Sequence, residues 1–306
     1  MKVTRRIALT LGAAALVATG CSGTGASGGS DITIGLAVST LNNPFFVELQ
    51  QGAQEMADQL GAKLTVVDAQ NDATNQINQV QTLVTQGVKA ILLNPVDSKQ
   101  SAPAAKAAEM ANIPLISVDR AVEGGKVAAE VASNNVSGGS LAAIELGRAA
   151  SGEVAHLKGI PGASASRDRG QGFEQGLNSG NIKVAATAVA DFDRAKGLNE
   201  TTNLLQGHPG LKGIFAENDE MALGAIKALG ARAGKDVMVV GFDGTPDGLK
   251  AIQDGTLTAT IAQQPKLLGS KAVEQAVHAA KGEPVQQVVD VEVKVINAKN
   301  VAEFIK

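Results

Sequence analysis

Aromatic residues are scarce in this sequence, which has no tryptophan, no tyrosine and only seven phenylalanines. Because an aromatic side chain buries a large apolar area, the placement of those seven is informative. Charged residues make up 19% of the chain and hydrophobic residues 44%, which is typical of a globular protein rather than a disordered one. The length of 306 residues suits two domains, each large enough to bury its own core.

Several classes of functional site lack their sequence signatures. The three histidines, His156, His208 and His278, are widely spaced and have no cysteine companions, so a metal site is not expected. Residues 230–235 fall one position short of a phosphate-binding loop, and residues 162–166 lack the final glycine of a hydrolase nucleophile elbow. No dinucleotide-binding fingerprint follows any predicted strand. The sequence therefore predicts neither an enzyme nor a cofactor.

The first twenty residues are predicted to be a targeting segment rather than part of the fold. Cations near the start, including the adjacent Arg5 and Arg6, precede an apolar stretch at 7–18 that is shorter than a membrane-spanning helix of about 20 residues. The only cysteine, Cys21, follows directly. This arrangement resembles a lipoprotein signal, in which cleavage leaves the cysteine as the acylated first residue, and the Ser/Gly-rich residues 22–30 have the composition of a tether. The alternative is a buried structural cysteine, and the two arginines are compatible with a twin-arginine export route.

The charge balance argues against a nucleic-acid partner. Removal of residues 1–20 leaves 24 cations against 30 anions, a net charge of −6, and no basic patch. No later apolar run is long and uncharged enough to span a bilayer. Contact with a membrane is therefore expected only through the lipid anchor, on the outer side of the cell membrane or in the periplasm.

Strand and helix patterns alternate along the rest of the chain. Residues 31–38 are typical of a buried strand, and apolar residues then recur at spacings of three and four from Phe46 to Leu60, as on a packed helix. This alternation predicts right-handed βαβ units around parallel sheets. Further strands are expected at 63–68, 90–94, 113–118, 154–157, 182–189, 211–216, 236–241, 257–262 and 289–296, and further helices at 75–86, 101–111, 167–177, 194–206 and 265–281.

Polar residues recur in the two halves of the chain at a constant offset of 124 positions. Each of them follows a short apolar run that is predicted to be a strand. The pairs are Asn43 with Arg167, Asn94 with Asn218, and Asp119 with Asp243. Because open α/β sheets bind ligands beyond the carboxyl ends of their strands, the repeat predicts one site shared between two similar domains. The alternative is that these are ordinary polar loops.

Four loop motifs carry a resemblance to a known family. They are Asn42-Asn43-Pro44-Phe45-Phe46, Asp191-Phe192-Asp193-Arg194, Glu217-Asn218-Asp219-Glu220-Met221-Ala222 and Val240-Gly241-Phe242-Asp243-Gly244-Thr245. From about Asp31 to Val295 the chain resembles the periplasmic ribose-binding proteins of the type I periplasmic binding protein family. The resemblance implies an α/β fold of two similar doubly wound parallel-sheet domains joined by a three-segment hinge. It also implies a monomeric receptor that closes on ribose and delivers it to the permease and ATPase subunits of an ABC importer.

The resemblance further implies where the domains divide. The chain would cross between lobes near Asn134, Gln263 and Glu292. One lobe would then comprise residues 31–133 with 264–292, and the other residues 134–263 with 293–306. These lobes would follow the signal peptide at 1–20 and the tether at 21–30.

Eleven residues are implied as sugar contacts by the family motifs. They are Asn43, Phe45, Phe46, Asn94, Asp119, Arg120, Arg167, Phe192, Asn218, Asp243 and Gln263. Their types suit a sugar, because ionised carboxylates accept hydrogen bonds, guanidiniums donate them and amides do both, while phenylalanine rings can cover C–H faces. Two carboxylates and two guanidiniums sum to zero charge, which favours a neutral polyol over a sugar phosphate.

Most of these residues also have a purely structural interpretation. Asn43 before Pro44 is a suitable helix N-cap, and Phe46 lies in the apolar stripe of the following helix. Arg167 could be a solvated residue at a helix start. The remaining alternatives are surface charges for Asp119 and Arg120, and turn or cap residues for Asn94, Asn218 and Asp243.

Two other functional classes share parts of this pattern. A sugar-responsive transcription regulator would need an N-terminal helix-turn-helix, where this chain has a signal segment. A sugar-modifying enzyme could use Asp119 and Asp243, but arginines in the same site would keep both ionised and deny the proton donor that glycoside hydrolysis needs. Within the receptor class, the sequence leaves allose, other pentoses and a furanosyl signalling molecule open as ligands.

Overall fold

The computed structural model describes residues 32–177 and 181–305. The predicted signal peptide, Cys21 and the tether lie outside the described residues, so these assignments stay predictions. Within the described ranges, no helix is long and apolar enough to cross a membrane.

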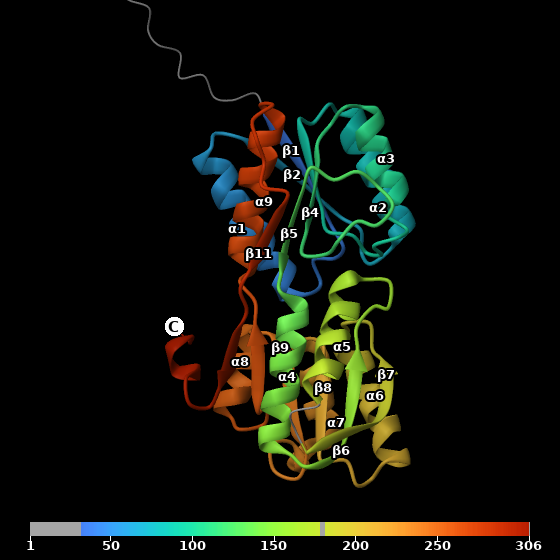
Figure 1. The fold of residues 1–306 in the computed structure, drawn as a ribbon, viewed down its shortest axis with the longest axis vertical. Helices are drawn as coiled ribbons and strands as arrows, with labels where there is room; N and C mark the ends of the chain where they lie inside the picture. Colours follow the sequence, from blue (N-terminus) through green and yellow to red (C-terminus); the bar gives the residue numbers. More distant parts are fainter. Residues whose placement is uncertain (1–31, 178–180, 306) are drawn as a thin grey trace, which may run out of the picture.

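Two six-stranded sheets form the cores of two α/β lobes that lie end to end (Figure 1). The N-terminal lobe has the strand order β11-β5-β4-β3-β1-β2, and all its neighbouring strands are parallel. Its strands are β1 (Thr33–Val38), β2 (Lys63–Asp68), β3 (Ala90–Leu93), β4 (Leu115–Val118), β5 (Ala129–Ser133) and β11 (Val288–Val291).

The sheet of the C-terminal lobe repeats this order, as β12-β10-β9-β8-β6-β7. Its edge strand β12 is antiparallel to β10, whereas β11 is parallel to β5. The strands are β6 (Gly152–Lys158), β7 (Ile182–Val189), β8 (Gly213–Ala216), β9 (Met238–Asp243), β10 (Ala259–Ala262) and β12 (Lys294–Asn297). The matching order makes the lobes two copies of one topology.

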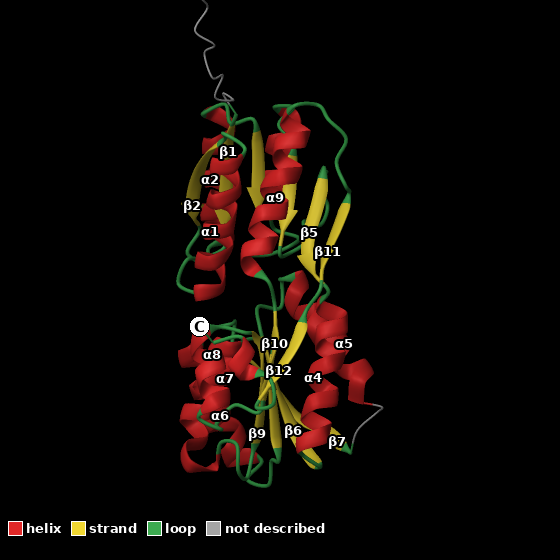
Figure 2. Ribbon diagram, turned by 90° about the vertical axis from the view of Figure 1, so that its left-hand side faces the viewer, coloured by secondary structure: helices red, strands yellow, loops and turns green. Residues whose placement is uncertain are grey.

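Helices cover both faces of each sheet (Figure 2). In the N-terminal lobe, α1 (Pro44–Gln59) and α9 (Pro265–Ala280) pack on one face, and α2 (Ala73–Thr85) and α3 (Ala102–Met110) pack on the other. Alternation along β1 fits this arrangement, because Leu36 packs with α1 and α9 while Ala37 packs with α2 and α3.

The C-terminal lobe is covered in the same way. Helices α4 (Asn135–Ala149) and α5 (Ser164–Gly176) pack on one face of its sheet. Helices α6 (Arg194–Gly207), α7 (Asp219–Leu229) and α8 (Pro246–Gln253) pack on the other face. Short 3₁₀ helices occupy Gly230–Arg232 and Val301–Glu303. The predicted fold class of two doubly wound parallel-sheet domains is confirmed.

The chain passes between the two sheets at three places. These are the junctions between β5 and α4, between β10 and α9, and between β11 and β12. The prediction of a single last strand at 289–296 is wrong, because its first half pairs with β5 and its second half with β10. Both halves alternate in the same way, so periodicity gives no sign that the chain changes sheet between them.

Three helices of the C-terminal lobe, α4, α7 and α8, were not predicted, and α5 begins three residues before the expected start at Arg167. Helix α4 contains the pair Gly138 and Gly139, which lowers its helix propensity. The pair is explained by packing: a Cβ at Gly139 would lie 2.1 Å from the carbonyl oxygen of Arg169 in α5. Close approach of two helices thus overrides local preference there.

Candidate functional site

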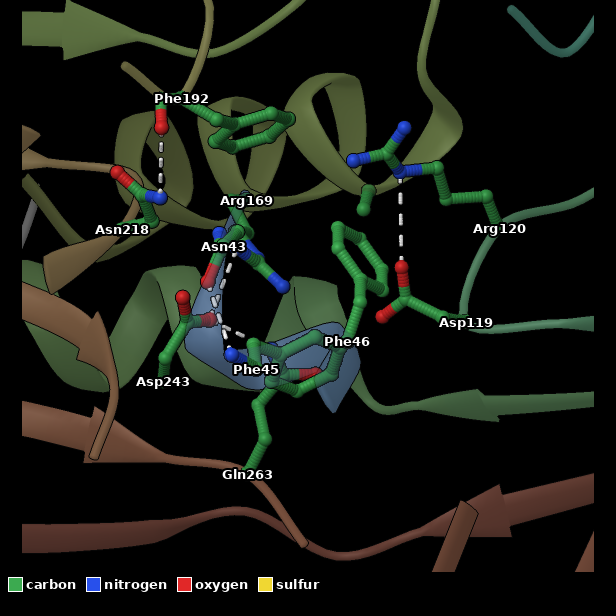
Figure 3. Close-up of a pocket in the computed structure, with 11 residues that line it drawn as sticks. Asn43, Phe45, Phe46, Asp119, Arg120, Arg169, Phe192, Asn218, Asp243 and Gln263 are labelled. Carbon is green, nitrogen blue, oxygen red and sulfur yellow. Dashed lines mark hydrogen bonds and ion pairs between the residues drawn. The ribbon is translucent and has the colours of Figure 1, made fainter. Parts of the chain in front are cut away.

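A pocket lies between the lobes, where the loops after the strands of both sheets meet. The space among its lining residues is about 240 Å³, which includes space open to solvent. Figure 3 shows the polar side chains of both lobes converging on this space. The lining residues are Asn43, Phe45, Phe46, Asp119, Arg120, Ala165, Arg169, Phe192, Asn218, Asp243 and Gln263.

The start of α1 brings an amide and two aromatic rings into the pocket. Asn43 is the N-cap, and its Oδ1 accepts a hydrogen bond from the backbone N–H of Phe45 at 2.9 Å. Pro44 occupies the first helical position, where its missing N–H costs nothing. The rings of Phe45 and Phe46 meet edge to face, with centroids 5.1 Å apart. Capping and core packing therefore coexist with pocket lining at these residues.

The loop after β4 supplies a buried charge pair. Asp119 and Arg120 are only 3% and 4% exposed, so the alternative of surface charges is wrong. Asp119 Oδ2 lies 3.5 Å from Arg120 Nε and accepts a hydrogen bond from Asn94 Nδ2 at 3.1 Å. Asn94 is fully buried and is absent from the pocket lining. It also accepts a hydrogen bond from the backbone N–H of Ser39, so it holds two site loops together.

Arg169 of α5 is the central cation of the C-terminal half of the pocket. Its Nε donates to Asn135 Oδ1 at 2.8 Å, and its Nη1 donates to the carbonyl oxygen of Glu217 at 2.7 Å. Nη1 also lies 3.6 Å from Asp243 Oδ1, and the guanidinium stacks 3.8 Å from the centroid of the Phe242 ring. These contacts fix the direction of the guanidinium before any ligand is considered.

The structure does not place Arg167 in the pocket, so the expected role of this residue is corrected. Its side chain is 41% exposed and forms an ion pair with Glu123 at the rim of the lobe interface. Because α5 begins at Ser164, positions 167 and 169 differ by about 200° around the helix and face different ways. The constant offset of 124 fails at this pair. Helical spacing of the buried residues Ser166, Arg169 and Phe173 is the signal that identifies the correct arginine.

Phe192 and Asn218 come from two other loops of the C-terminal lobe, and Asp243 is the last residue of β9. The Arg120 guanidinium carbon lies over the rings of both Phe192 and Phe46, at 5.3 and 5.2 Å from their centroids. Asn218 caps α7 through its Oδ1, and its Nδ2 donates to the carbonyl oxygen of Phe192 at 3.2 Å. Asn218 is thus both a cap residue and a pocket residue.

Two of these residues, and Asp119 in the other lobe, have strained backbones. The φ angle is +67° at Asp119, +61° at Phe192 and +115° at Asp243. Such values are costly for residues other than glycine and persist only where the surrounding structure enforces them. Asp243 is further held by Gln263 on the β10–α9 crossing, whose Nε2 donates to its Oδ1 at 2.7 Å.

Burial dominates the electrostatics of the pocket. Removal from water raises the pKa of Asp119, although the nearby Arg120 and Arg169 act in the opposite direction. Burial likewise raises the pKa of Asp243 well above its ordinary value and lowers the pKa of the Arg120 guanidinium. The charges are therefore expensive to keep in the pocket without partners.

Three polar atoms of the lining lack a hydrogen-bond partner although they are buried. They are Asp119 Oδ1, Arg120 Nε and Gln263 Oε1. They comprise two acceptors and one donor, a combination that a hydroxyl-bearing ligand can satisfy. Among residues 32–177 and 181–305, no group of three or more His, Cys, Asp or Glu side chains is arranged to hold a metal ion.

A buried network behind the pocket was not anticipated from the sequence. The Glu217 carboxylate bonds His156 Nε2 at 2.8 Å, the backbone N–H of Gly159 at 2.7 Å and the hydroxyl of Ser166. The same residue accepts the Arg169 hydrogen bond through its carbonyl oxygen. Glu217 therefore ties together three segments that position the arginine.

Comparison with known proteins identifies the family to which the chain belongs. Residues 34–284 match the family described as periplasmic binding protein domain. The chain is 50% identical over 266 residues to the ribose import binding protein RbsB of Escherichia coli (strain K12), covering 86% of this chain and 90% of that protein. Its identity to RbsB of Bacillus subtilis (strain 168) is 47% over 273 residues, covering 88% of each chain.

A solved structure agrees with these sequence comparisons. It is that of an ABC transporter solute-binding protein from Mycobacterium smegmatis with bound glycerol, which superposes with a TM-score of 0.85 at 35% identity, covering 90% of this chain and 98% of that one. These relatives are solute-binding proteins rather than enzymes, and the family implies an extracytoplasmic location. The chain thus belongs to the periplasmic binding protein family.

Proposed function

We propose that this protein is an extracytoplasmic receptor that captures ribose between its two lobes and delivers it to an ABC-type importer. The observation that carries the proposal is the interlobe pocket, whose lining contains two buried acceptors and one buried donor that have no hydrogen-bond partner in the protein. The similarity to ribose import binding proteins indicates ribose as the ligand and an importer as the destination. The permease and ATPase subunits of that importer would be the partners. Relatives named for D-allose and D-apiose make other monosaccharides the alternative ligands.

The proposed contacts divide by chemistry. Asp119 and Asp243 accept hydrogen bonds from sugar hydroxyls, Arg120 and Arg169 donate them, and three amides do both. The rings of Phe45, Phe46 and Phe192 cover the C–H faces. Asn94 acts through Asp119, which it orients, rather than by touching the sugar. The three amides are Asn43, Asn218 and Gln263.

Binding is proposed to occur by hinge closure. The three crossings near Asn134, Gln263 and Glu292 are short, so a rigid rotation of one lobe against the other would open the pocket to solvent. A sugar that bridges the lobes favours the closed form, because it contacts both lobes only there. The importer would then recognise the closed form. The lobes would be residues 31–133 with 264–292 and residues 134–263 with 293–306.

Anchoring through acylated Cys21 belongs to the same proposal and is tested separately. Growth with a radiolabelled or alkyne-tagged fatty acid should label the wild type and leave Cys21→Ser unlabelled. Equal labelling of both would refute the anchor.

The ligand is tested by calorimetry and thermal shift on the mature protein with a panel of pentoses and hexoses. Ribose should bind most tightly. An epimer should bind several-fold to about a hundredfold more weakly, because each misplaced hydroxyl leaves a buried partner unpaired at about 1 to 3 kcal/mol. Absence of binding heat with every monosaccharide would refute the proposal. Tighter binding of allose than of ribose would change the assigned ligand but leave the assignment as a sugar receptor intact.

A further inference from the structure

The lobes touch at a second place, beside the sugar pocket, through residues that are absent from its lining. On the N-terminal side these residues are in the loops after β3 and β4, and on the C-terminal side in the loop after β6 and the first turn of α5. Figure 1 shows the start of α5 directed toward the N-terminal lobe. The contact set comprises Ser98, Ala121 and Glu123 on one lobe and Gly162, Ser164 and Arg167 on the other.

Three hydrogen bonds of this set cross between the lobes. The backbone N–H of Ser98 donates to the carbonyl oxygen of Gly162 at 2.9 Å. The backbone N–H of Ser164 donates to Ser98 Oγ at 3.1 Å, and the backbone N–H of Ala121 donates to Ser164 Oγ at 2.8 Å. Ser98 is fully buried and Ser164 is 8% exposed, so the serine hydroxyls that take part in these bonds are largely shielded from water.

The ion pair between Glu123 and Arg167 closes the outer edge of the same contact. Arg167 is positioned for it by its own lobe, because its Nη1 donates to the carbonyl oxygen of Gly162 at 2.9 Å. Glu123 is positioned by the other lobe through a backbone hydrogen bond to the carbonyl oxygen of Ser98 at 2.8 Å. Ion pair and hydrogen bonds therefore form one connected unit.

The approach of the backbones is also specific. A Cβ at Gly162 would lie 1.9 Å from Asp97 Oδ2 in the other lobe, so a larger residue there would require the Asp97 side chain to move. The Asp97 side chain is itself held by the backbone N–H groups of Lys99 and Gln100, at 2.9 Å each. The two surfaces fit each other as built, which distinguishes them from an accidental contact of surface loops.

We propose that this interlobe latch (Ser98, Ala121, Glu123, Gly162, Ser164 and Arg167) sets the stability of the closed form and thereby the rate at which the ligand is released. The proposal rests on the hinge-closure function above. Because latch contacts exist only when the lobes are closed, they shift the equilibrium toward the binding-competent form without touching the sugar. Apparent affinity scales with the population of that form, so weakening the latch weakens binding of every ligand by the same factor.

The latch is tested with Glu123→Gln and Arg167→Gln, which keep size and remove charge. Because the ion pair is partly exposed, each variant should raise the dissociation rate of ribose about two- to fivefold. The ratio of affinities for ribose and a weaker-binding monosaccharide should stay unchanged. The double variant should be no worse than either single one, since both remove the same interaction. Dissociation is measured by stopped-flow fluorescence with an environment-sensitive dye attached to a cysteine introduced at the lobe edge.

A matched control is Glu109→Gln, which breaks the exposed pair between Lys106 Nζ and Glu109 Oε2 on α3, within one lobe. It should leave the release rate unchanged. Release rates in the latch variants equal to those of the wild type and the control would overturn the latch, and so would an altered selectivity ratio. Failure of the wild type to bind any monosaccharide would instead overturn the proposed function, so the two failures are distinguishable.

Discussion

The two lobes share one topology but hold their site loops with different chemistry. In the N-terminal lobe the ties are neutral amides: Gln76 joins Asn94 and Val96, and Asn94 joins Ser39 and Asp119. In the C-terminal lobe charged groups supply many of the ties, as the Glu217 network and the contacts of Arg169 show, beside the neutral amide of Asn218. Two lobes of the same topology therefore hold their site loops with different groups placed on different elements.

The carboxylate of Asp219 is the clearest case of this difference. It accepts hydrogen bonds from the backbone N–H and the hydroxyl of Thr245, at 2.7 and 3.0 Å, and from the hydroxyl of Thr260 at 2.7 Å. Burial raises the pKa of Asp219 to about 6 in spite of these bonds. In the other lobe, the Gln76 side chain holds the loop after β3 through hydrogen bonds to Asn94 and Val96, and it has no titratable group. Asp219 is thus expected to make the stability of the C-terminal lobe depend on pH.

Among the changes that test this difference between the lobes, Arg169→Ala is expected to have the largest effect on ligand binding. This change leaves Asp243 buried without its cation, which typically costs about 3 to 5 kcal/mol. The thermal stabilisation by ribose should fall below detection, and the Kd from calorimetry should rise more than a hundredfold. Arg167→Ala is the control, since that side chain lies at the rim, and it should keep most of the ligand-induced shift. Equal loss in both variants would contradict the assignment of Arg169 to the site.

A second test uses the pH dependence of Asp219. A carboxyl whose pKa is raised by folding holds its proton more tightly in the folded state, so its stabilising contribution is full below its unfolded pKa of about 3.8. That contribution is lost as pH rises through about 6. The wild type should lose about 2 kcal/mol of unfolding free energy relative to Asp219→Asn between pH 4 and pH 7. Urea denaturation at several pH values measures the difference, and parallel curves for the two proteins would refute it.

The smallest effect on stability is expected for a change to a neutral amide of the N-terminal lobe. Gln76→Ala leaves the carbonyl oxygen of Asn94 and the backbone N–H of Val96 without their partner, at a cost of about 1 to 3 kcal/mol. Because glutamine does not titrate, the loss should be the same at pH 4 and pH 7. Urea denaturation would again provide the measurement. A loss that varies with pH would show that the neutral tie is coupled to a titrating group.

The two halves of the pocket also differ in which of their buried polar atoms lack a hydrogen-bond partner. Two of its three unpartnered atoms, Asp119 Oδ1 and Arg120 Nε, belong to the N-terminal lobe, and the third is on the Gln263 crossing. Arg169 and Asp243 in the C-terminal lobe already have protein partners. Protein partners orient polar groups in both halves of the site, but the buried atoms left without a hydrogen bond lie in the N-terminal lobe and on the Gln263 crossing.

Much of the architecture was determined by the sequence alone. Apolar runs of four to eight residues, separated by helical stripes, predict parallel sheets because each strand is buried on both faces and each helix on one. Local motifs identified most of the pocket, since Asn43 and Asn218 are caps placed directly after strands, where the ends of parallel sheets bind ligands. These signals are contained within a few neighbouring residues, so they can be recognised without the fold.

Tertiary structure decided the rest. Whether Arg167 or Arg169 faces the pocket depends on the residue at which α5 begins, because two positions along a helix turn the side chain by about 200°. Contacts of Asn94 and Glu217 with distant loops, and the bonds of Ser164 with the other lobe, join positions that are far apart in the chain. Such contacts leave no periodic trace in the sequence, because their partners are brought together only when both sheets and all three crossings are in place.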